Sequence, residues 1–531
     1  MMPPSRLHRP LQMGRRGAVG SNHPQATLAG LDVLRAGGNA VDAAVAVALA
    51  LGVCEPSSSG LGGDGFYHVH DAAKGTARVF NGSGVAPLGA TAESYAGGIP
   101  TWGPRSVSVP GLLAGVAAMH AALGSRPWAG LVAPAIALAR EGFAATHIYC
   151  RGLGEHRERL AADPRSATTF LGKQLGDLVV QADLARTLEE IAADGAESFY
   201  RGRLAVRLAA AMQAQGVAIT RADLQGFAPE VQAPIGITYR GWEVRQTPPN
   251  STGFTLLQML KIAERFDLRS AAPADALHIL IEAKKRAFMD RETYGADPRF
   301  ETVPLDLLLS DAHADAHAAA IDMARAAVVP QPADAKGGDT TYFAVVDAAG
   351  NAVSAIQSIN SGYGSGVTAG DTGVLLNNRM AYWHLAAGHP NRLQPGKRVR
   401  HTMNAPMVYR DGQLAIVLGT PGADNQVQVN LQVLAAMLDH GADPQTALEA
   451  PRWTSTQAGQ GANWPHEGDG RLTIETDFAS DVLAALERRG HVLNRVGHLM
   501  GPCAMQVIQL LPNGIRAAGS DPRRDGWALA Y

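Results

Sequence analysis

Two threonines stand in the second half of this 531-residue sequence, where a loop-like stretch gives way to a strand-like one. Thr340 and Thr341 follow residues 329–338, which carry Pro, Ala and Gly without apolar periodicity. A threonine hydroxyl is a weak nucleophile unless a base lies beside it, and a threonine at a chain N-terminus can use its own α-amine as that base. Here that chemistry requires cleavage between Asp339 and Thr340. The alternative is that two β-branched residues simply begin a strand.

The sequence that follows Thr340 predicts a β-hairpin that gathers further polar groups. Two apolar runs flank a turn at 347–351. If Ala349 is the centre of this turn, Ser358 lies opposite Thr340, and Asn360 lies on the same face because side chains alternate along a strand. A hydroxyl and an amide would then lie beside the threonine hydroxyl. A polar sheet edge in solvent is the alternative, and a register shift of one residue would separate the groups.

A glycine-bearing turn could supply the other group that amide chemistry needs. Gly419-Thr420-Pro421-Gly422-Ala423 comes after a predicted strand and before a predicted helix. Backbone N–H groups at such a turn can stabilise the oxyanion that develops on an attacked carbonyl. An ordinary strand-to-helix turn is the alternative.

The elements that must position these residues differ between the two halves of the chain. Segments with 3.6-residue apolar spacing dominate up to residue 289, whereas strand-like runs and helices alternate after residue 340. This mixture predicts a layered α/β or α+β protein. Gly60, Gly62 and Gly65 match the pattern G-x-G-x-x-G. Because a helix precedes them and a strand follows, we interpret them as a structural turn and not as a dinucleotide site.

Composition limits the classes of partner. The net charge is −2 and the sequence pI is about 6.8, so no strong field favours nucleic acid or an anionic membrane. A content of 46% hydrophobic and 18% charged residues suits a compact protein with a large core. The first 20 residues hold no apolar run of signal-peptide length, and the three cysteines are far apart and odd in number. We therefore expect a cytoplasmic protein with reduced thiols.

Several motifs, in one order along nearly the whole chain, resemble the γ-glutamyltransferase family of N-terminal-nucleophile hydrolases. Those around the threonine pair are Gly338-Asp339-Thr340-Thr341-Tyr342-Phe343, Gly350-Asn351-Ala352-Val353 and Gly373-Val374-Leu375-Leu376-Asn377-Asn378. Those elsewhere are Gly37-Gly38-Asn39-Ala40-Val41-Asp42-Ala43-Ala44, Gly62-Gly63-Asp64-Gly65-Phe66, Pro248-Pro249-Asn250-Ser251-Thr252-Gly253, Ala450-Pro451-Arg452 and Ser520-Asp521-Pro522-Arg523.

The resemblance implies a fold and a maturation step. The fold would be α+β, a four-layer αββα N-terminal-nucleophile hydrolase sandwich made as one precursor that cleaves itself before Thr340. Residues 1–339 would form the large subunit, which is rich in helices and ends in the processing loop. Residues 340–531 would form the small subunit, and both would share one core.

The resemblance also assigns roles in catalysis. Thr340 would be the nucleophile, with Ser358 and Asn360 beside it. The backbone at Gly422 and Ala423 would form the oxyanion hole. Members of the family usually have two glycines there, and a backbone donor survives the change to Ala423.

The positions that recognise the substrate depart from the family pattern. Relatives that act on γ-glutamyl compounds often have Arg where Val85 stands, Gln and Asp where Arg379 and Tyr382 stand, and a Ser-Ser pair where His401 and Thr402 stand. Arg379, Tyr382, His401 and Thr402 are thus the candidate substrate-binding residues. A guanidinium at Arg379 would repel an ammonium and offer a carboxylate two hydrogen bonds. The alternative is that Arg379 forms a structural ion pair.

We therefore expect an amidohydrolase or acyltransferase with a threonine nucleophile that cleaves γ-glutamyl-type or related carboxylate-bearing amides. One alternative is an acylase for dicarboxylic monoamides that resemble oxamate or glutaryl amides. An alternative of another class is a catalytically weak homologue that only binds a ligand. The resemblance implies no metal and no organic cofactor. The expected partners are a small-molecule amide and the two subunits of one precursor, without nucleic acid or membrane.

Overall fold

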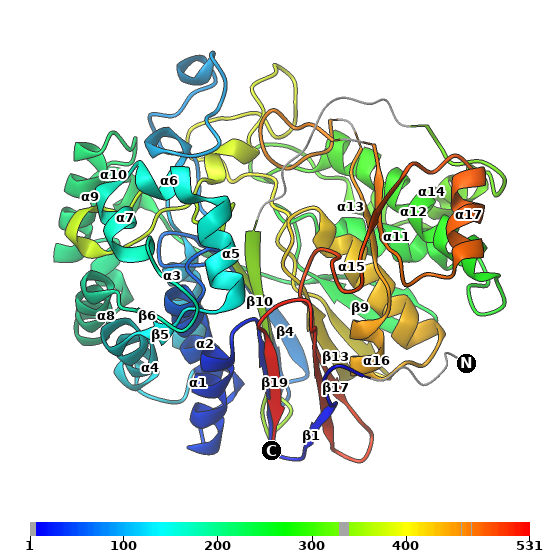
Figure 1. The fold of residues 1–531 in the computed structure, drawn as a ribbon, viewed down its shortest axis with the longest axis horizontal. Coiled ribbons are helices and arrows are strands. Elements are labelled where there is room, and N and C mark those ends of the chain that lie inside the picture. The colour runs from blue at the N-terminus through cyan, green and yellow to red at the C-terminus, as the bar shows by residue number, and fades with distance from the viewer. Residues whose placement is uncertain (1–6, 329–338, 458, 469) are drawn as a thin grey trace.

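Two seven-stranded sheets form the centre of the molecule in the computed structural model, which describes residues 7–328, 339–457, 459–468 and 470–531 (Figure 1). Sheet 1 contains, in spatial order, β19 (Trp527–Ala530), β2 (Ala18–Ser21), β10 (Asp339–Val346), β11 (Ala352–Asn360), β3 (Asp64–Asp71), β4 (Thr76–Gly82) and β7 (Glu230–Gln232). Sheet 2 contains β1 (Gln12–Gly14), β18 (Arg516–Ser520), β17 (Gln506–Leu510), β13 (Gln413–Gly419), β12 (Met407–Arg410), β9 (Trp242–Gln246) and β8 (Ile235–Tyr239).

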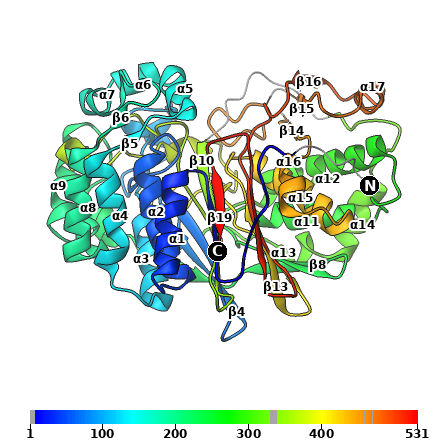
Figure 2. The same ribbon diagram turned by 60° about the horizontal axis from the view of Figure 1, so that its bottom comes forward.

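Helices cover the outer face of each sheet (Figure 2). Those on the side of sheet 1 are α1 (Pro24–Arg35), α2 (Ala40–Cys54), α3 (Leu112–Leu123), α4 (Trp128–Glu141), α5 (His147–Glu155), α6 (Arg157–Ala161), α7 (Pro164–Phe170), α8 (Ala182–Asp194), α9 (Arg203–Ala214) and α10 (Arg221–Gly226). Those on the side of sheet 2 are α11 (Gly253–Ala263), α12 (Pro273–Tyr294), α13 (Leu305–Leu308), α14 (Asp311–Ala319), α15 (Asn425–Leu434), α16 (Pro444–Glu449) and α17 (Ser480–Arg488).

Smaller sheets complete the structure at its periphery. One contains β14 (Trp453–Ser455), β15 (Leu472–Glu475) and β16 (Leu493–Val496), and another pairs β5 (Phe143–Ala144) with β6 (Leu178–Val179). Within the described ranges, no helix is both long enough and apolar enough to cross a membrane.

Three apolar cores separate the layers. One lies between sheet 1 and its helices, one between sheet 2 and its helices, and one between the two sheets. Along β10, Tyr342 and Ala344 belong to the core between the sheets, whereas Phe343 and Val345 belong to the core under the helices. Both faces of the strand are buried, which explains its continuous apolar sequence. The predicted four-layer αββα sandwich is confirmed.

The helix before the Gly-rich segment shows how tightly the first layer packs. α2 consists almost entirely of Ala, Val and Leu, and nearly all of it is buried. A capping box begins it, because the side chain of Asn39 accepts from the backbone N–H of Asp42 while the side chain of Asp42 accepts from that of Asn39. The chain then passes through the Gly60–Gly65 segment directly into β3, so the interpretation as a structural turn agrees with the structure.

The hairpin around Thr340 has the predicted register along most of its length. Thr341 pairs with Gln357 and Val346 with Ala352, as a turn centred on Ala349 requires. A β-bulge interrupts the ladder at Thr340, and Asp339 then pairs with Asn360. The extra residue is on β11, because Ser358 and Ile359 together stand opposite Thr340, and such irregularities are common beside active sites.

Candidate active site

Thr340 lies at the start of β10 with its side chain in a polar environment. It is on the same face of β10 as Tyr342, the face that looks toward sheet 2, and it is 2% exposed. Its Oγ1 lies 3.4 Å from Oγ of Ser358, and the backbone N–H of Asn360 donates to the same Oγ at 2.7 Å. The predicted proximity of these three residues is therefore present in spite of the bulge.

Asn360 is held in an unusual conformation at the end of β11. Its φ is +83°, in the left-handed region that asparagine tolerates better than most residues. The amide Nδ2 donates to the carbonyl of Asn378 at 3.1 Å and to Oδ1 of Asn463 at 2.9 Å. The amide orientation is therefore fixed, with Oδ1 turned toward the guanidinium of Arg379.

Asp64, at the start of β3, is the buried anion of the site. It stands directly opposite Ser358 in the ladder between β3 and β11. Its Oδ1 accepts from the backbone N–H of Gly84 at 2.7 Å, and its Oδ2 accepts from Nε of Arg379 at 2.9 Å. Burial alone would raise the pKa of Asp64, but the hydrogen bond from His401 and the charge of Arg379 outweigh burial and hold the pKa below its usual value.

Arg379 joins Asp64 to Asn360 and retains a donor. It begins a short 3₁₀ helix, Arg379–Tyr382, and its side chain is 1% exposed. Nη1 donates to Oδ1 of Asn360 at 3.2 Å, and the guanidinium carbon lies 4.5 Å from the centre of the Tyr382 ring. Nη2 has no hydrogen-bond partner among the described residues. The structural ion pair and the ligand-binding role are thus both compatible with this one side chain.

His401 and Thr402 complete the cluster predicted to contact the substrate. Nδ1 of His401 accepts from the backbone N–H of Met403 at 3.2 Å, so its proton is on Nε2, which faces Oδ2 of Asp64 at 3.5 Å. Burial, together with the charge of Arg379, lowers the pKa of His401 to about 4, and the ring is neutral at pH 7. The hydroxyl groups of Thr402 and Tyr382 lie 3.2 Å apart. All four predicted residues therefore come together.

The Gly419–Ala423 turn lies at the same end of the sandwich as Thr340. A Cβ on Gly419 would come within 2.3 Å of the Tyr342 ring, so the end of β13 lies against β10. Gly422 has a φ of +122° and Ala423 a φ of +48°, and α15 begins two residues later. A Cβ on Gly422 would meet Sγ of Cys503 at 2.4 Å. The turn therefore requires glycine at 422 but tolerates alanine at 423.

No sequence pattern assigned a role to Asp64 or Asn463. Asp64 stood in the quoted Gly62-Gly63-Asp64-Gly65 motif, and a carboxylate among glycines was the available signal. Asn463 comes from a segment without any motif. An isolated β-bridge pairs Val85 with Arg398. Arg398 does not replace the arginine that relatives carry at the position of Val85, because its side chain donates to Ser83 and Glu230.

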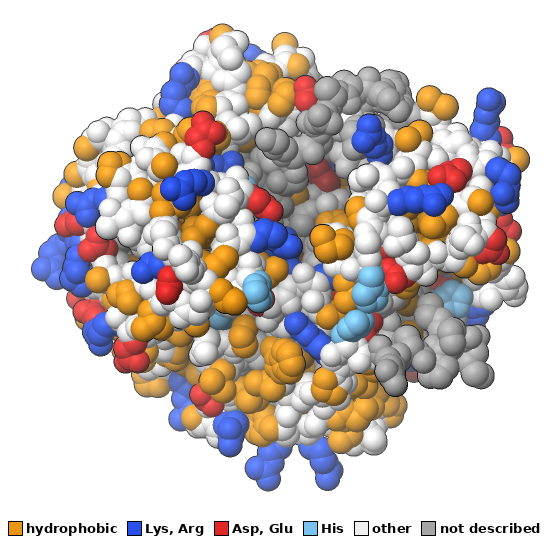
Figure 3. Space-filling view, viewed as in Figure 1, with side chains coloured by type: hydrophobic (Ala, Val, Ile, Leu, Met, Phe, Trp, Pro, Cys, Tyr) orange, Lys and Arg blue, Asp and Glu red, His pale blue; other side chains and the backbone are white. Residues whose placement is uncertain are grey.

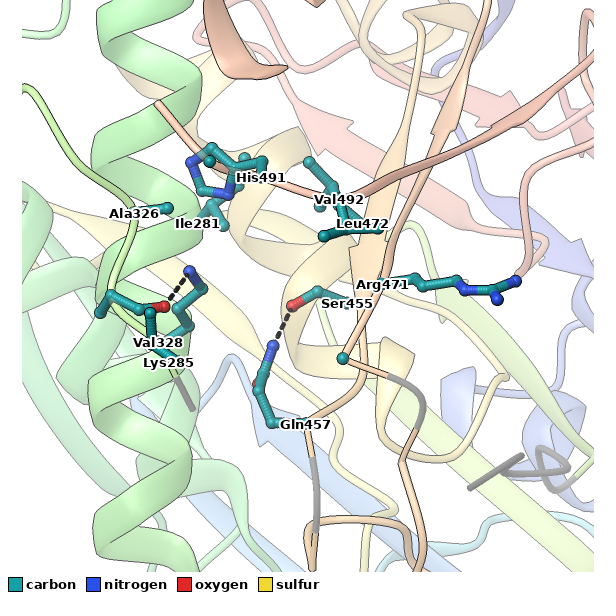
Figure 4. A pocket seen from close by; sticks show the side chains of 13 residues that line it. Ile281, Lys285, Ala326, Val328, Ser455, Gln457, Arg471, Leu472, His491 and Val492 are labelled. Atoms are coloured by element: carbon teal, nitrogen blue, oxygen red, sulfur yellow. Dashed lines mark hydrogen bonds between the residues drawn. The ribbon is translucent and has the colours of Figure 1, made fainter. Parts of the chain in front are cut away.

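Two cavities lie outside the cluster of predicted site residues. The one drawn in Figure 4, of about 170 Å³, is lined by Lys285, Ser455 and His491 and by none of the predicted site residues. A cavity of about 690 Å³ is lined by His384 and Trp464 among others, and Trp464 follows directly after the Asn463 that contacts Asn360. Figure 3 shows the surface hollowed between the two helical layers, with histidines near the hollow.

The chain matches known proteins over nearly its whole length. The family model described as Gamma-glutamyltranspeptidase matches residues 26–531. The chain is 38% identical to the glutathione hydrolase-like YwrD proenzyme of Bacillus subtilis (strain 168), over 97% of this chain and 99% of that protein. It is also 38% identical to the acylase ACY 1 proenzyme of Pseudomonas sp. (strain SE83), over 97% of this chain and 94% of that protein.

A solved structure agrees with the observed architecture. The crystal structure of cephalosporin acylase from Bacillus halodurans superimposes with a TM-score of 0.91 and 35% identity, covering 100% of this chain and 98% of that one. The family model, these relatives and the four-layer fold lead to the same conclusion: this chain belongs to the gamma-glutamyltranspeptidase family.

Proposed function

We propose that Thr340 is the nucleophile of this amidohydrolase or acyltransferase, and that it becomes active when the bond between Asp339 and Thr340 is cut. The observation that carries the proposal is a row of buried polar side chains across three neighbouring strands: Thr340 on β10, Ser358 on β11 and Asp64 on β3. Cleavage would leave both pieces in the same sheets, because β10 and β11 lie between β2 and β3.

The proposed reaction begins with the free α-amine of Thr340. The amine takes the hydroxyl proton as Oγ1 bonds to the substrate carbonyl carbon, and the carbonyl oxygen becomes an oxyanion. Backbone N–H groups of Gly422 and Ala423 stabilise that oxyanion. The C–N bond then breaks, the ammonium returns its proton to the leaving nitrogen, and the acyl group remains as an ester on Thr340. Water or an amine then attacks the ester and releases the acyl group.

We propose further that the acyl group carries a carboxylate and no α-ammonium. The buried Nη2 of Arg379 offers a charge-assisted hydrogen bond to a carboxylate. An ammonium would need an acceptor, but the carboxylate of Asp64 already accepts from Gly84, Arg379 and His401. This pattern supports a dicarboxylic monoamide, such as a glutaryl amide or the smaller oxamate.

A second candidate is hydrolysis of γ-glutamyl compounds, which the name of the Bacillus subtilis relative favours. Its substrates carry an α-ammonium, which the guanidinium of Arg379 would repel and for which Asp64, the carboxylate of this cluster, already has three donors. The two candidates therefore predict opposite rankings of the same substrates.

The test compares kcat/KM for glutathione with kcat/KM for a chromogenic glutaryl amide and for oxamate. We expect the wild-type protein to prefer an amide without an α-ammonium by about tenfold or more, since a buried charged donor left without an acceptor costs roughly 1–3 kcal/mol or more. Arg379→Gln removes the charge that repels an ammonium and should lose most of that preference.

Arg392→Gln is the matched control, because that arginine is partly exposed and forms its ion pair with Glu93 at the surface. The control should keep the wild-type ranking. A wild-type protein that prefers glutathione, or a ranking that Arg379→Gln leaves unchanged, would contradict the proposed substrate class and support the second candidate.

A further inference from the structure

A cluster of potential metal ligands lies in the helical layer outside sheet 2, remote in sequence from the hairpin that carries Thr340. His313 and His317 come from α14, and Asp290 comes from α12. Nε2 of His313 lies 2.7 Å from Oδ2 of Asp290, and Nε2 of His317 lies 3.1 Å from the same oxygen. The two Nε2 atoms are themselves 3.0 Å apart. Three ligand atoms of the kinds that zinc prefers therefore converge on one point.

The sequence builds this arrangement locally. His313 and His317 are four residues apart on a helix, so their side chains lie on one face, one turn apart. Both rings are about one-fifth exposed and Asp290 is 13% exposed, which leaves a path for an ion from solvent. A cation about 2.0–2.1 Å from each of four tetrahedral ligands holds the ligand atoms about 3.3 Å apart, so these side chains would separate by about 0.2–0.6 Å to bind it.

A fourth side chain points to a ligand independently of the histidines. Gln258 of α11 is 2% exposed and donates from Nε2 to the same Oδ2 of Asp290 at 2.7 Å, while its Oε1 has no hydrogen-bond partner in the described part of the chain. Rotation of the amide would exchange these two atoms and direct Oε1 to the point where the other three converge. That rotation gives Oε1 a cation as its partner and moves Nε2 to the position that has no described partner.

Neighbouring positive charges are neutralised. Lys261 pairs with Asp311 at 2.8 Å, and Arg265 pairs with Asp311 and Asp315 at 2.7 and 2.8 Å. These contacts hold both cations on the acidic residues of α14. The cluster therefore offers an ion one carboxylate and two imidazoles. The two neighbouring cations, Lys261 and Arg265, are both paired with acidic residues.

We propose that Asp290, His313, His317 and Gln258 form a binding site for a divalent transition-metal ion of the zinc type. Each imidazole must offer the Nε2 lone pair, so a neutral ring carries its proton on Nδ1, which makes no hydrogen bond with any described residue for either ring. A neutral ring binds the ion without releasing a proton, and no oxidation is involved. The ion would join α11, α12 and α14 and stabilise this part of the helical layer. The site departs from the expectation that no metal takes part, and it is separate from the proposed catalysis.

The experiment uses the full chain without an affinity tag, stripped with a chelator and dialysed against micromolar Zn²⁺. We expect one zinc per chain by elemental analysis, and X-ray absorption at the zinc edge should show two imidazole ligands. His317→Ala should weaken zinc binding by at least about tenfold, since even loss of an outer-shell partner costs 10–100-fold. Asp290→Asn should do the same.

His440→Gln is the matched control, because this histidine is exposed and lies outside the cluster. It should bind zinc as the wild-type protein does, and zinc should raise the unfolding temperature of these two proteins but not of His317→Ala. A wild-type protein that retains no zinc, or a His317→Ala protein that retains as much as the control, would overturn the proposal. Neither readout depends on cleavage at Thr340 or on activity.

Discussion

At the scale of single residues, Asp64 holds the candidate site together. One carboxylate receives the backbone N–H of Gly84, the guanidinium of Arg379 and the imidazole of His401, and all of these groups are buried. Such a carboxylate is needed because a buried guanidinium without a counter-charge is strongly unfavourable. Asp64 thereby allows Arg379 to present Nη2 to a ligand without the whole cost of an isolated charge.

Asp64→Asn should destabilise the fold as well as the site. Removing one partner of a buried ion pair typically costs about 3–5 kcal/mol, because the remaining charge is left uncompensated. We expect a loss of that order in the free energy of unfolding, measured by chemical denaturation. Asp71→Asn, at the other end of β3, removes a pair with the exposed Lys74 and should cost less than about 1 kcal/mol. Equal losses in the two variants would refute this role for Asp64.

At the scale of elements, the turn after β13 has a backbone that requires glycine at position 422. Gly422→Ala should lower kcat by at least about tenfold, since displacement of one oxyanion-hole donor costs about 10²–10³ in rate. The added Cβ would meet Sγ of Cys503, so the turn must shift. Gly441→Ala is the control: its φ is also positive, at +69°, but nothing lies within 4 Å of the new Cβ. Normal kcat in Gly422→Ala would show that this turn is not the oxyanion hole.

The pairing of β10 with β11 could be predicted from the sequence, whereas the bulge and the partner of Arg379 could not. Alternation and the position of the turn predicted the pairing of β10 with β11, because both depend on residues close in sequence. The bulge at Thr340 was not predictable, since one extra residue leaves no trace in an apolar pattern. The partner of Arg379 was equally hidden, because Asp64 lies 315 residues away along the chain. The layered fold could be predicted through the family resemblance, whereas the pairing of Arg379 with Asp64 is visible only in the three-dimensional structure.

At the scale of the whole molecule, several histidines are buried as neutral rings. Burial lowers the pKa of His23 and His68 to about 4, and burial with the charge of Arg379 does the same for His401. The unfolded chain has an ordinary pKa near 6.5 for each. Between these values the unfolded state binds more protons, so this stability is complete above pH 6.5 and is lost as the pH falls toward 4.

The free energy of unfolding should therefore decrease between pH 6.5 and 4, by up to about 3 kcal/mol for each ring. Chemical denaturation at a series of pH values measures the slope. His68→Gln should show a shallower slope than the wild-type protein, and the exposed His440→Gln should not. A slope that is equal in all three proteins would exclude His68 as a contributor.

Division of the chain at Thr340 would free the α-amine that serves as the base for the threonine hydroxyl. The first two strands after the proposed cut, β10 and β11, lie in sheet 1 between β2 and β3, which precede it, so the two pieces would remain associated. Intact mass spectrometry and N-terminal sequencing of the purified protein test directly for cleavage between Asp339 and Thr340. We expect two co-purifying fragments of about 35 and 20 kDa by length, the smaller beginning at Thr340, and a single uncut chain for Thr340→Ala. A wild-type protein that stays uncut, or a Thr340→Ala protein cut at the same bond, would show that Thr340 does not cleave the chain before itself.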